Sequence, residues 1–158
     1  MNRSLLGGVS RMITADAAPL RLRAFDLEDL GVVSSMVQDA LVPGRDMKYL
    51  SEERSFMLAL NRFQWESAGD TPPYSRSHAG LRFDHVTHVS RRGIGPDSAD
   101  KIFALLAIAY HDYAVMLTFS GNAAIRLTVE KLAIGLTDLG TPWPTQWKPG
   151  HDPDAMAD

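Results

Sequence analysis

The sequence predicts an α+β domain built on a mostly antiparallel sheet of about seven strands. Its 158 residues match the length of one typical domain. Short segments in which apolar residues recur at every second position outnumber segments with helical spacing. The links between these segments are too short for the crossovers that parallel strands require, so neighbouring strands are expected to pair antiparallel.

The first strand and the first helix follow one another near the N-terminus. Residues 20–25 alternate with the period of a half-buried strand. Asp26 can then cap a helix, and Glu28 and Asp29 suit the positive end of its dipole. Apolar residues recur at helical spacing until residues 43–44, a Pro-Gly pair, where we expect this segment to end.

The middle of the chain is predicted to form a hairpin and a further strand. Residues 47–50 and 55–65 make the hairpin, and its second arm carries apolar residues on both faces. Glycines and prolines mark residues 67–78 as a loop. Residues 81–90 alternate as a strand.

The last part is predicted to form three strands in meander order and a final helix. Residues 101–110 are rich in branched and aromatic residues, as in a buried strand, and residues 113–119 and 124–128 follow after tight turns. Over residues 129–139 the apolar positions fall on one helical stripe, which stops at Gly140. We therefore expect a C-terminal packing helix.

This organisation divides the chain into a flexible N-terminal arm at residues 1–18, one domain at residues 19–140 and a tail at residues 141–158. The prolines of the tail oppose both a helix and a central strand. Because Met12 precedes alanine-rich sequence, residues 1–11 are interpreted as a candidate upstream extension.

The predicted order of strands and helices suits a partly open barrel closed by a C-terminal helix. Pleckstrin-homology and phosphotyrosine-binding folds have that architecture, and the latter also have a helix after the first strand. A plain two-layer α+β sandwich is the alternative.

Composition and charge exclude several classes of protein. The chain has no cysteine, which excludes disulfides, thiolate metal sites and cysteine nucleophiles. The apolar stretch at residues 103–110 is much shorter than the roughly 20 residues that a membrane-spanning helix needs. The formal net charge of −3 gives no global attraction for nucleic acid or anionic lipid. We therefore expect a cytoplasmic protein that does not contact membranes.

A locally basic stretch over residues 62–92 is the clearest indication of a binding site. A guanidinium group binds two oxygens at once, which suits recognition of phosphate. No RNA-recognition consensus or zinc-finger spacing accompanies the stretch, and arginines on strand faces most often form ion pairs or face solvent. The candidate anion-binding residues are Arg62, Arg82, Arg91, Arg92 and His88.

Catalytic and metal-binding patterns are weak. His85 and His88 have a helical ligand spacing, but on a strand they point to opposite faces and cannot share a metal. Asp84 and His88 share a face and are the best candidates if the chain is an enzyme for a small polar molecule. We predict no metal site and no cofactor, and favour a protein that is not an enzyme.

Three tryptophans are candidates for an aromatic contact surface. Trp65, Trp143 and Trp147 can stack on bases or line a peptide groove. The alternative is that they pack loops and the tail onto the domain.

Several segments together resemble a small alphaproteobacterial family known only as a domain of unknown function. The resemblance covers residues 20–152 and implies a bacterial cytoplasmic protein, but it implies no activity, cofactor or catalytic residue. The segments that carry it are FDLEDL at 25–30, QDA at 38–40, LNRFQWE at 60–66, GLRFD at 80–84, RGI at 92–94 and AIRLTVE at 124–130.

Three hypotheses for function remain open. The first is a non-catalytic interaction module that holds a protein or peptide partner along a strand edge or in a barrel–helix groove. The second is a binder of an anion, phosphate or nucleic acid through the arginine cluster. The third, an enzyme, has the least support. Assembly into a homo-oligomer also stays open.

Overall fold

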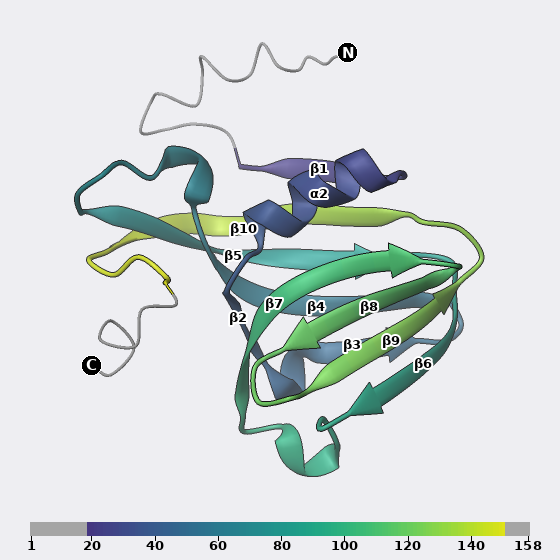
Figure 1. Ribbon diagram of the computed structural model, residues 1–158. Coiled ribbons are helices and arrows are strands. Elements are labelled where there is room, and N and C mark those ends of the chain that lie inside the picture. The colour runs from purple at the N-terminus through teal and green to yellow at the C-terminus, as the bar shows by residue number, and fades with distance from the viewer. Residues whose placement is uncertain (1–18, 151–158) are drawn as a thin grey trace.

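The computed structural model describes residues 19–150 (Figure 1). One α-helix and ten strands make up this part of the chain, with three short 3₁₀ segments between them. The expected flexible arm at residues 1–18 and the end of the expected tail, residues 151–158, lie outside the described residues. The elements are β1 (Arg21–Ala24), α2 (Leu27–Met36), β2 (Ala40–Pro43), η1 (Gly44–Asp46), β3 (Met47–Leu50), β4 (Ser55–Phe63), η2 (Trp65–Ser67), β5 (Tyr74–Phe83), β6 (Val86–Arg92), η3 (Pro96–Ser98), β7 (Ile102–His111), β8 (Ala114–Phe119), β9 (Ala124–Val129) and β10 (Ile134–Thr145).

All ten strands belong to one antiparallel sheet, which bends so that its two halves face each other (Figure 1). The strand order is β1-β10-β5-β4-β2-β7-β8-β9-β6, and β3 pairs with β4 beside that path. The sheet is open, because the path starts at β1 and ends at β6. Hydrogen bonds from Val86 N to Arg54 O and from Tyr49 Oη to Val86 O bring the start of β6 against the β3–β4 hairpin.

The core lies between the two halves of the bent sheet. Alternate residues of β4 and β5, such as Phe56, Leu58 and Leu81, point inward and are buried. From the other half, alternate residues of β8 and β9, such as Leu117 and Leu127, meet them. Burying each such side chain stabilises the fold by about 1.5–3 kcal/mol relative to leaving it in water.

The helix α2 closes one side of this core and follows its sequence prediction closely at the start. Asp26 caps it, with its Oδ1 accepting a hydrogen bond from Asp29 N at 2.8 Å. Leu30 and Val33 face the core and are buried. The helix is shorter than predicted, because it ends at Met36 and the chain has begun strand β2 by Ala40.

The predicted C-terminal helix is wrong, since those residues form the end of β9, a turn and strand β10. Ile134, Leu136 and Asp138 alternate inward along β10, which lies between β1 and β5. The inward position of Asp138 breaks the apolar alternation of a strand, so the remaining apolar residues happen to match a helical stripe. β10 also runs on to Thr145, so the first residues of the expected tail pair with β5.

The predicted number of about seven strands is also too low. β2 and β10 were not predicted, and the segment at 81–90 divides between β5 and β6 at a turn where His85 has a φ of 60°. In place of the expected closing helix, the described chain has α2 alone on one side of an open sheet. The antiparallel α+β class is confirmed, whereas the C-terminal helix of a pleckstrin-homology-like barrel is not found among residues 19–150.

Candidate functional site

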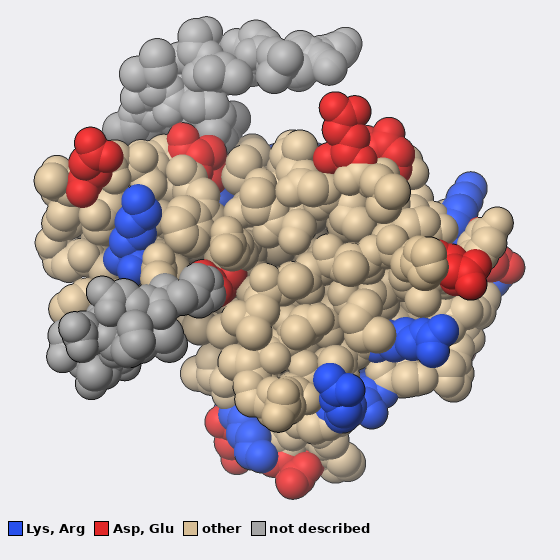
Figure 2. Space-filling model, in the orientation of Figure 1, with Lys and Arg blue, Asp and Glu red and all other residues tan. Residues whose placement is uncertain are grey.

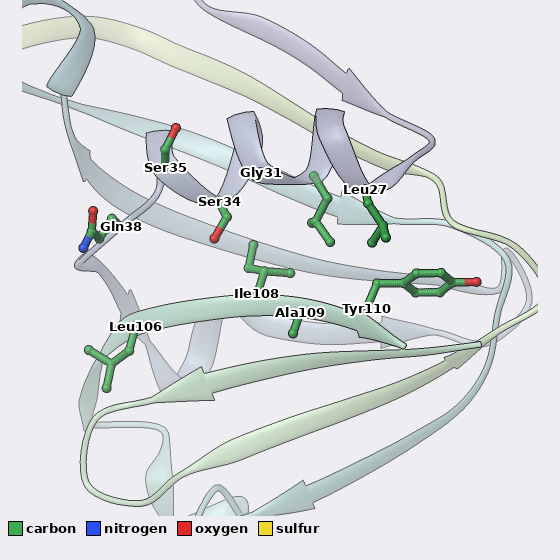
Figure 3. Close-up of a pocket in the computed structure, with 10 residues that line it drawn as sticks. Leu27, Gly31, Ser34, Ser35, Gln38, Leu106, Ile108, Ala109 and Tyr110 are labelled. Atoms are coloured by element: carbon green, nitrogen blue, oxygen red, sulfur yellow. The ribbon is translucent and has the colours of Figure 1, made fainter. Parts of the chain in front are cut away.

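A groove lies between α2 and β7 on the described surface. Its volume is about 530 Å³, within the ~300–1,000 Å³ usual for ligand sites. Figure 3 shows Leu27 and Ser34 pointing from the helix toward β7, and Ile108 pointing back toward the helix. The ten residues that line it are Leu27, Leu30, Gly31, Ser34, Ser35, Gln38, Leu106, Ile108, Ala109 and Tyr110.

The helix side of the groove follows from the helical period of α2. Leu27, Gly31 and Ser34 recur every three or four residues, so they share one face, and Gln38 follows just after the helix ends. This face is apolar at its start and polar at its end. Leu27 is 64% exposed, although a leucine at the start of an amphipathic helix ordinarily packs inward.

Gly31 opens the middle of the groove. A glycine within a helix is destabilising by roughly 0.5–1 kcal/mol relative to alanine. A Cβ added at Gly31 would meet nothing within 4 Å, so no close contact inside the protein requires glycine there. Gly44 is the opposite case, because a Cβ there would lie 2.0 Å from Ser98 O.

The strand side of the groove is an unpaired edge. β7 pairs with β2 only over Ile102–Leu105, whereas its pairing with β8 continues to His111. Beyond Leu105, no described strand lies along the edge of β7 opposite β8. Four residues of that free edge, Leu106, Ile108, Ala109 and Tyr110, line the groove. Leu106 is 40% exposed there, although the sequence analysis predicted a buried strand.

The β7–β8 turn determines which backbone groups point to the free edge. Asp112 and Tyr113 both have positive φ, as in a two-residue hairpin turn, so His111 and Ala114 form a hydrogen-bonded pair. The alternation of antiparallel pairs then directs the N–H and C=O of Ile108 and Tyr110 away from β8. In the described chain, neither a strand nor a side chain forms a hydrogen bond with these groups.

Acidic side chains lie around one end of the groove. Asp26, Glu28 and Asp29 lie at the start of α2, and Asp112 lies in the β7–β8 turn. Figure 2 shows acidic side chains over the start of the helix and beside that turn, with an uncharged face between them. Within residues 19–150, none of these four forms a salt bridge.

Arg62, the first predicted anion-binding residue, is buried in an ion-pair cluster. Its side chain is 0% exposed, and its Nε lies 2.7 Å from Asp138 Oδ1. Its two terminal nitrogens also donate to Glu66, at 2.9 Å and 2.6 Å. Burial lowers the pKa of Arg62, but hydrogen bonds from its guanidinium to Asp138 and Glu66 outweigh burial and raise it overall. The structure leaves Arg62 no free donor for an anion.

Arg82, the second, is partly exposed and is also paired with acids. Its Nε lies 2.8 Å from Asp84 Oδ1, and its Nη2 lies 3.3 Å from Glu53 Oε1. Hydrogen bonding to Asp84 raises the pKa of Arg82. Asp84 also accepts a hydrogen bond from Ser55 Oγ, whereas the exposed His88 pairs with Thr128 on another part of the sheet. The structure therefore does not bring together the candidate catalytic pair.

The remaining anion candidates gather on the edge strand β6. His88 and Arg92 pair with Thr128 and Ala124 of β9 and are exposed, and Arg92 Nε donates to Asn122 O. The guanidinium of Arg91 lies 5.9 Å from the ring centroid of Phe56. Arg126, which sequence analysis did not single out, pairs with Ser90 and adds a further exposed cation. Figure 2 shows basic side chains gathered over this part of the sheet.

The three tryptophans do not share one environment. Trp65 donates from Nε1 to Gln38 O at 3.1 Å, which places it at the C-terminal end of the groove. Trp143 packs on His78 with ring centroids 4.7 Å apart. Trp147 is 70% exposed.

The described residues lack two further features, a metal-binding cluster and a membrane-spanning helix. Residues 19–150 contain no cluster of three or more histidine, aspartate or glutamate side chains arranged to hold a metal ion. No helix in this part of the chain is long and apolar enough to cross a membrane.

Sequence analysis missed the groove because its strand side depends on pairing. The predicted buried strand at residues 101–110 did not reveal that β2 would stop pairing halfway along it. The sequence does carry one local signal of the helix side of the groove, a glycine within the helix. Gly31 interrupts an otherwise regular helical pattern between a cap and a turn, where alanine would be more stable.

The fold and the groove define a small α+β domain with one bent antiparallel sheet and one covering helix. The chain belongs to a family of proteins of unknown function, DUF2948, whose model matches residues 20–151. The resemblance to a family of unknown function is thereby confirmed, and the alphaproteobacterial origin stays a prediction. Searches among curated proteins and among solved structures find no match to the chain.

Proposed function

We propose that this protein is a non-catalytic binding module and that the α2–β7 groove is its site. The observation that carries the proposal is the combination, in one hollow, of exposed apolar side chains and an unpaired strand edge. Both features are unfavourable in water unless something covers them, because exposed apolar surface and free strand edges each favour association.

The side chains of the groove support binding over catalysis. Of its ten lining residues, Tyr110 is the one with a titratable side chain, and the others are aliphatic, glycine, serine or glutamine. General acid–base and nucleophilic chemistry need a titratable or activated group next to the substrate. A surface of this kind instead holds a ligand by contact area and by hydrogen bonds.

The cell compartment that fits this proposal is the bacterial cytoplasm. A chain with no cysteine needs no oxidising environment to fold, and the family resemblance in the sequence implied a bacterial protein.

A second candidate function is binding of an anion or nucleic acid on the outer face of β6 and β9. Arg92 and Arg126 lie there, and neither of them forms a salt bridge within residues 19–150. Four acidic groups flank the α2–β7 groove, so the two surfaces differ in charge. Binding of a phosphate-rich polymer to this face would weaken steeply with salt and with Arg92→Ala or Arg126→Ala.

A fragment screen on the full chain tests the groove as a site. Amide NMR spectra of isotope-labelled protein are recorded with small amphipathic fragments, and we expect the shifts to concentrate at residues 27–38 and 106–110. A Cβ added at Gly31 meets nothing within 4 Å, so Gly31→Trp can place its indole in the groove, and it is expected to lower fragment affinity by at least about ten-fold.

Gly69→Trp is the matched control for that screen. Gly69 lies in the η2–β5 loop, also has nothing within 4 Å of its added Cβ, and does not line the groove. It should bind fragments as the unchanged chain does. Fragments that shift amides elsewhere, or that bind Gly31→Trp equally well, would remove the groove as the site.

A further inference from the structure

We infer that the occupant of the α2–β7 groove is an extended segment of a partner protein, added as a further strand to the free edge of β7. The inference rests on the proposed function and names the chemistry of its ligand. Its basis is the pattern of unpaired backbone groups on residues 106–111, which is independent of the groove's apolar lining.

The free edge specifies an extended backbone. Ile108 and Tyr110 each present one N–H and one C=O, two residues apart, on the edge opposite β8. That spacing matches the alternating donors and acceptors of a β-strand and does not match a helix, whose backbone groups bond within the helix itself. Peptide-binding domains that use strand addition gain affinity from such main-chain hydrogen bonds.

The length of the edge sets the size of the occupant. Residues 106–111 extend over about 20 Å at ~3.3 Å per residue, and α2, with ten residues, covers about 15 Å. An added strand of about four to six residues therefore fits beside β7 under the helix. Along the N-terminal part of β7 this edge is already paired with β2, and Asp39 N donates to Leu105 O. The added strand would therefore begin where the pairing with β2 ends.

The lining residues indicate the side chains of the occupant. Alternate side chains of an added strand would point toward α2, where Gly31 and Ser34 leave room between Leu27 and Gln38. Apolar side chains fit those positions. The intervening side chains would face solvent, as on other edge strands.

The charges at one end of the groove indicate a basic residue in the partner. Glu28 lies one turn before Gly31 on the same side of α2, and Asp112 follows Tyr110 by two residues, so both acids flank that end. Neither has a salt-bridge partner within residues 19–150. A lysine or arginine at the corresponding end of the segment would complement them.

Selection from a displayed library of random peptides tests the composition. The full chain is the target, and peptides that also bind Gly31→Trp are discarded. We expect the remaining peptides to alternate apolar with other residues and to carry a lysine or arginine. Glu28→Gln and Asp112→Asn should each weaken them several-fold, and more so at low salt, whereas the exposed turn variant Glu52→Gln should not.

Hydrogen exchange of the full chain with such a peptide tests the mode of binding. We expect the amides of Ile108 and Tyr110 to become protected, because they donate to the added strand, while the Ala109 amide, already bonded to β8, changes little. N-methylation of the peptide at every second residue should then weaken binding about five- to ten-fold, and at the intervening residues little.

Three results would overturn the inference. Peptides that bind in the groove without protecting Ile108 and Tyr110 would refute strand addition while leaving the groove as a binding site. If fragments bind in the groove but the selection yields no peptide, a peptide ligand is refuted. Protection of both amides in the protein alone would mean that a second copy or residues 1–18 already occupy the edge.

Discussion

The Arg62 cluster and the α2–β7 groove both involve polar groups, but only the cluster satisfies them internally. The guanidinium of Arg62 has five N–H donors and forms five hydrogen bonds, to Asp138, Glu66 and the carbonyl of Phe63. In the groove, the backbone groups of Ile108 and Tyr110 have no partner in the described chain. A polar group with all its partners inside the fold serves stability, whereas one without them is available to a ligand.

The cluster also explains how distant parts of the sheet are held together. Asp138 on β10 accepts from Arg62 on β4, from Ser77 Oγ on β5 and from Leu20 N just before β1. Glu66 on η2 pairs with the other side of the guanidinium. One buried carboxylate, Asp138, thus links four strands or their ends, whereas the groove lies where β7 no longer pairs with β2.

Removing Asp138 is the strongest test of this contrast. Asp138→Ala leaves a buried cation with half of its partners, which should lower the free energy of unfolding by about 3–5 kcal/mol. Urea unfolding followed by circular dichroism measures the change. The double variant Arg62→Met with Asp138→Leu removes both charges, and it should recover much of that loss. A decrease below about 1 kcal/mol in Asp138→Ala would contradict a structural role for the cluster.

A second test uses the glycine that the fold requires. At Gly44 an added Cβ would lie 2.0 Å from Ser98 O, so the backbone between η1 and η3 has to move. We expect Gly44→Ala to lower the free energy of unfolding by about 1–3 kcal/mol, the usual range for overpacking. Thermal unfolding measures this loss. Unchanged amide NMR signals of α2 in the same variant would show that the groove is unaffected. A variant as stable as the unchanged chain would show that this contact relaxes freely.

The contrast also marks what sequence could and could not predict. Asp26 and its helix were predictable, because a cap acts within one turn. β10 was not, because the inward position of Asp138 makes sense only with Arg62, which lies 76 residues earlier in sequence. The groove depends on where β2 stops pairing with β7, and no local pattern encodes that register.

The third test uses the glycine that the fold does not require. Gly31→Ala adds a methyl group that meets nothing within 4 Å, so we expect the free energy of unfolding to rise by roughly 0.5–1 kcal/mol. The same variant narrows the groove, so its fragments or peptides should bind more weakly. Greater stability with weaker binding would show that this glycine serves a ligand at the cost of the fold. Unchanged binding would show that Gly31 has no role in ligand binding.

The smallest expected effect is that of Asp84, whose ion pair is the exposed counterpart of the Arg62 cluster. Partial burial raises the pKa of Asp84, but hydrogen bonds from Arg82 and Ser55 and the charge of Arg82 outweigh it, so the net pKa is below the ordinary 3.8. A carboxyl whose pKa falls on folding stabilises the folded state above its unfolded pKa and loses that contribution as pH falls through its folded pKa. Because Arg82 is 42% exposed and Asp84 29%, the contribution should be well under about 1 kcal/mol.

Urea unfolding at pH 6 and near pH 2.5 should show a slightly smaller loss of stability in Asp84→Asn than in the unchanged chain. An equal loss of stability in the variant and in the unchanged chain would mean that this partly exposed ion pair does not stabilise the fold. The contrast with the buried Arg62 cluster would then be larger still.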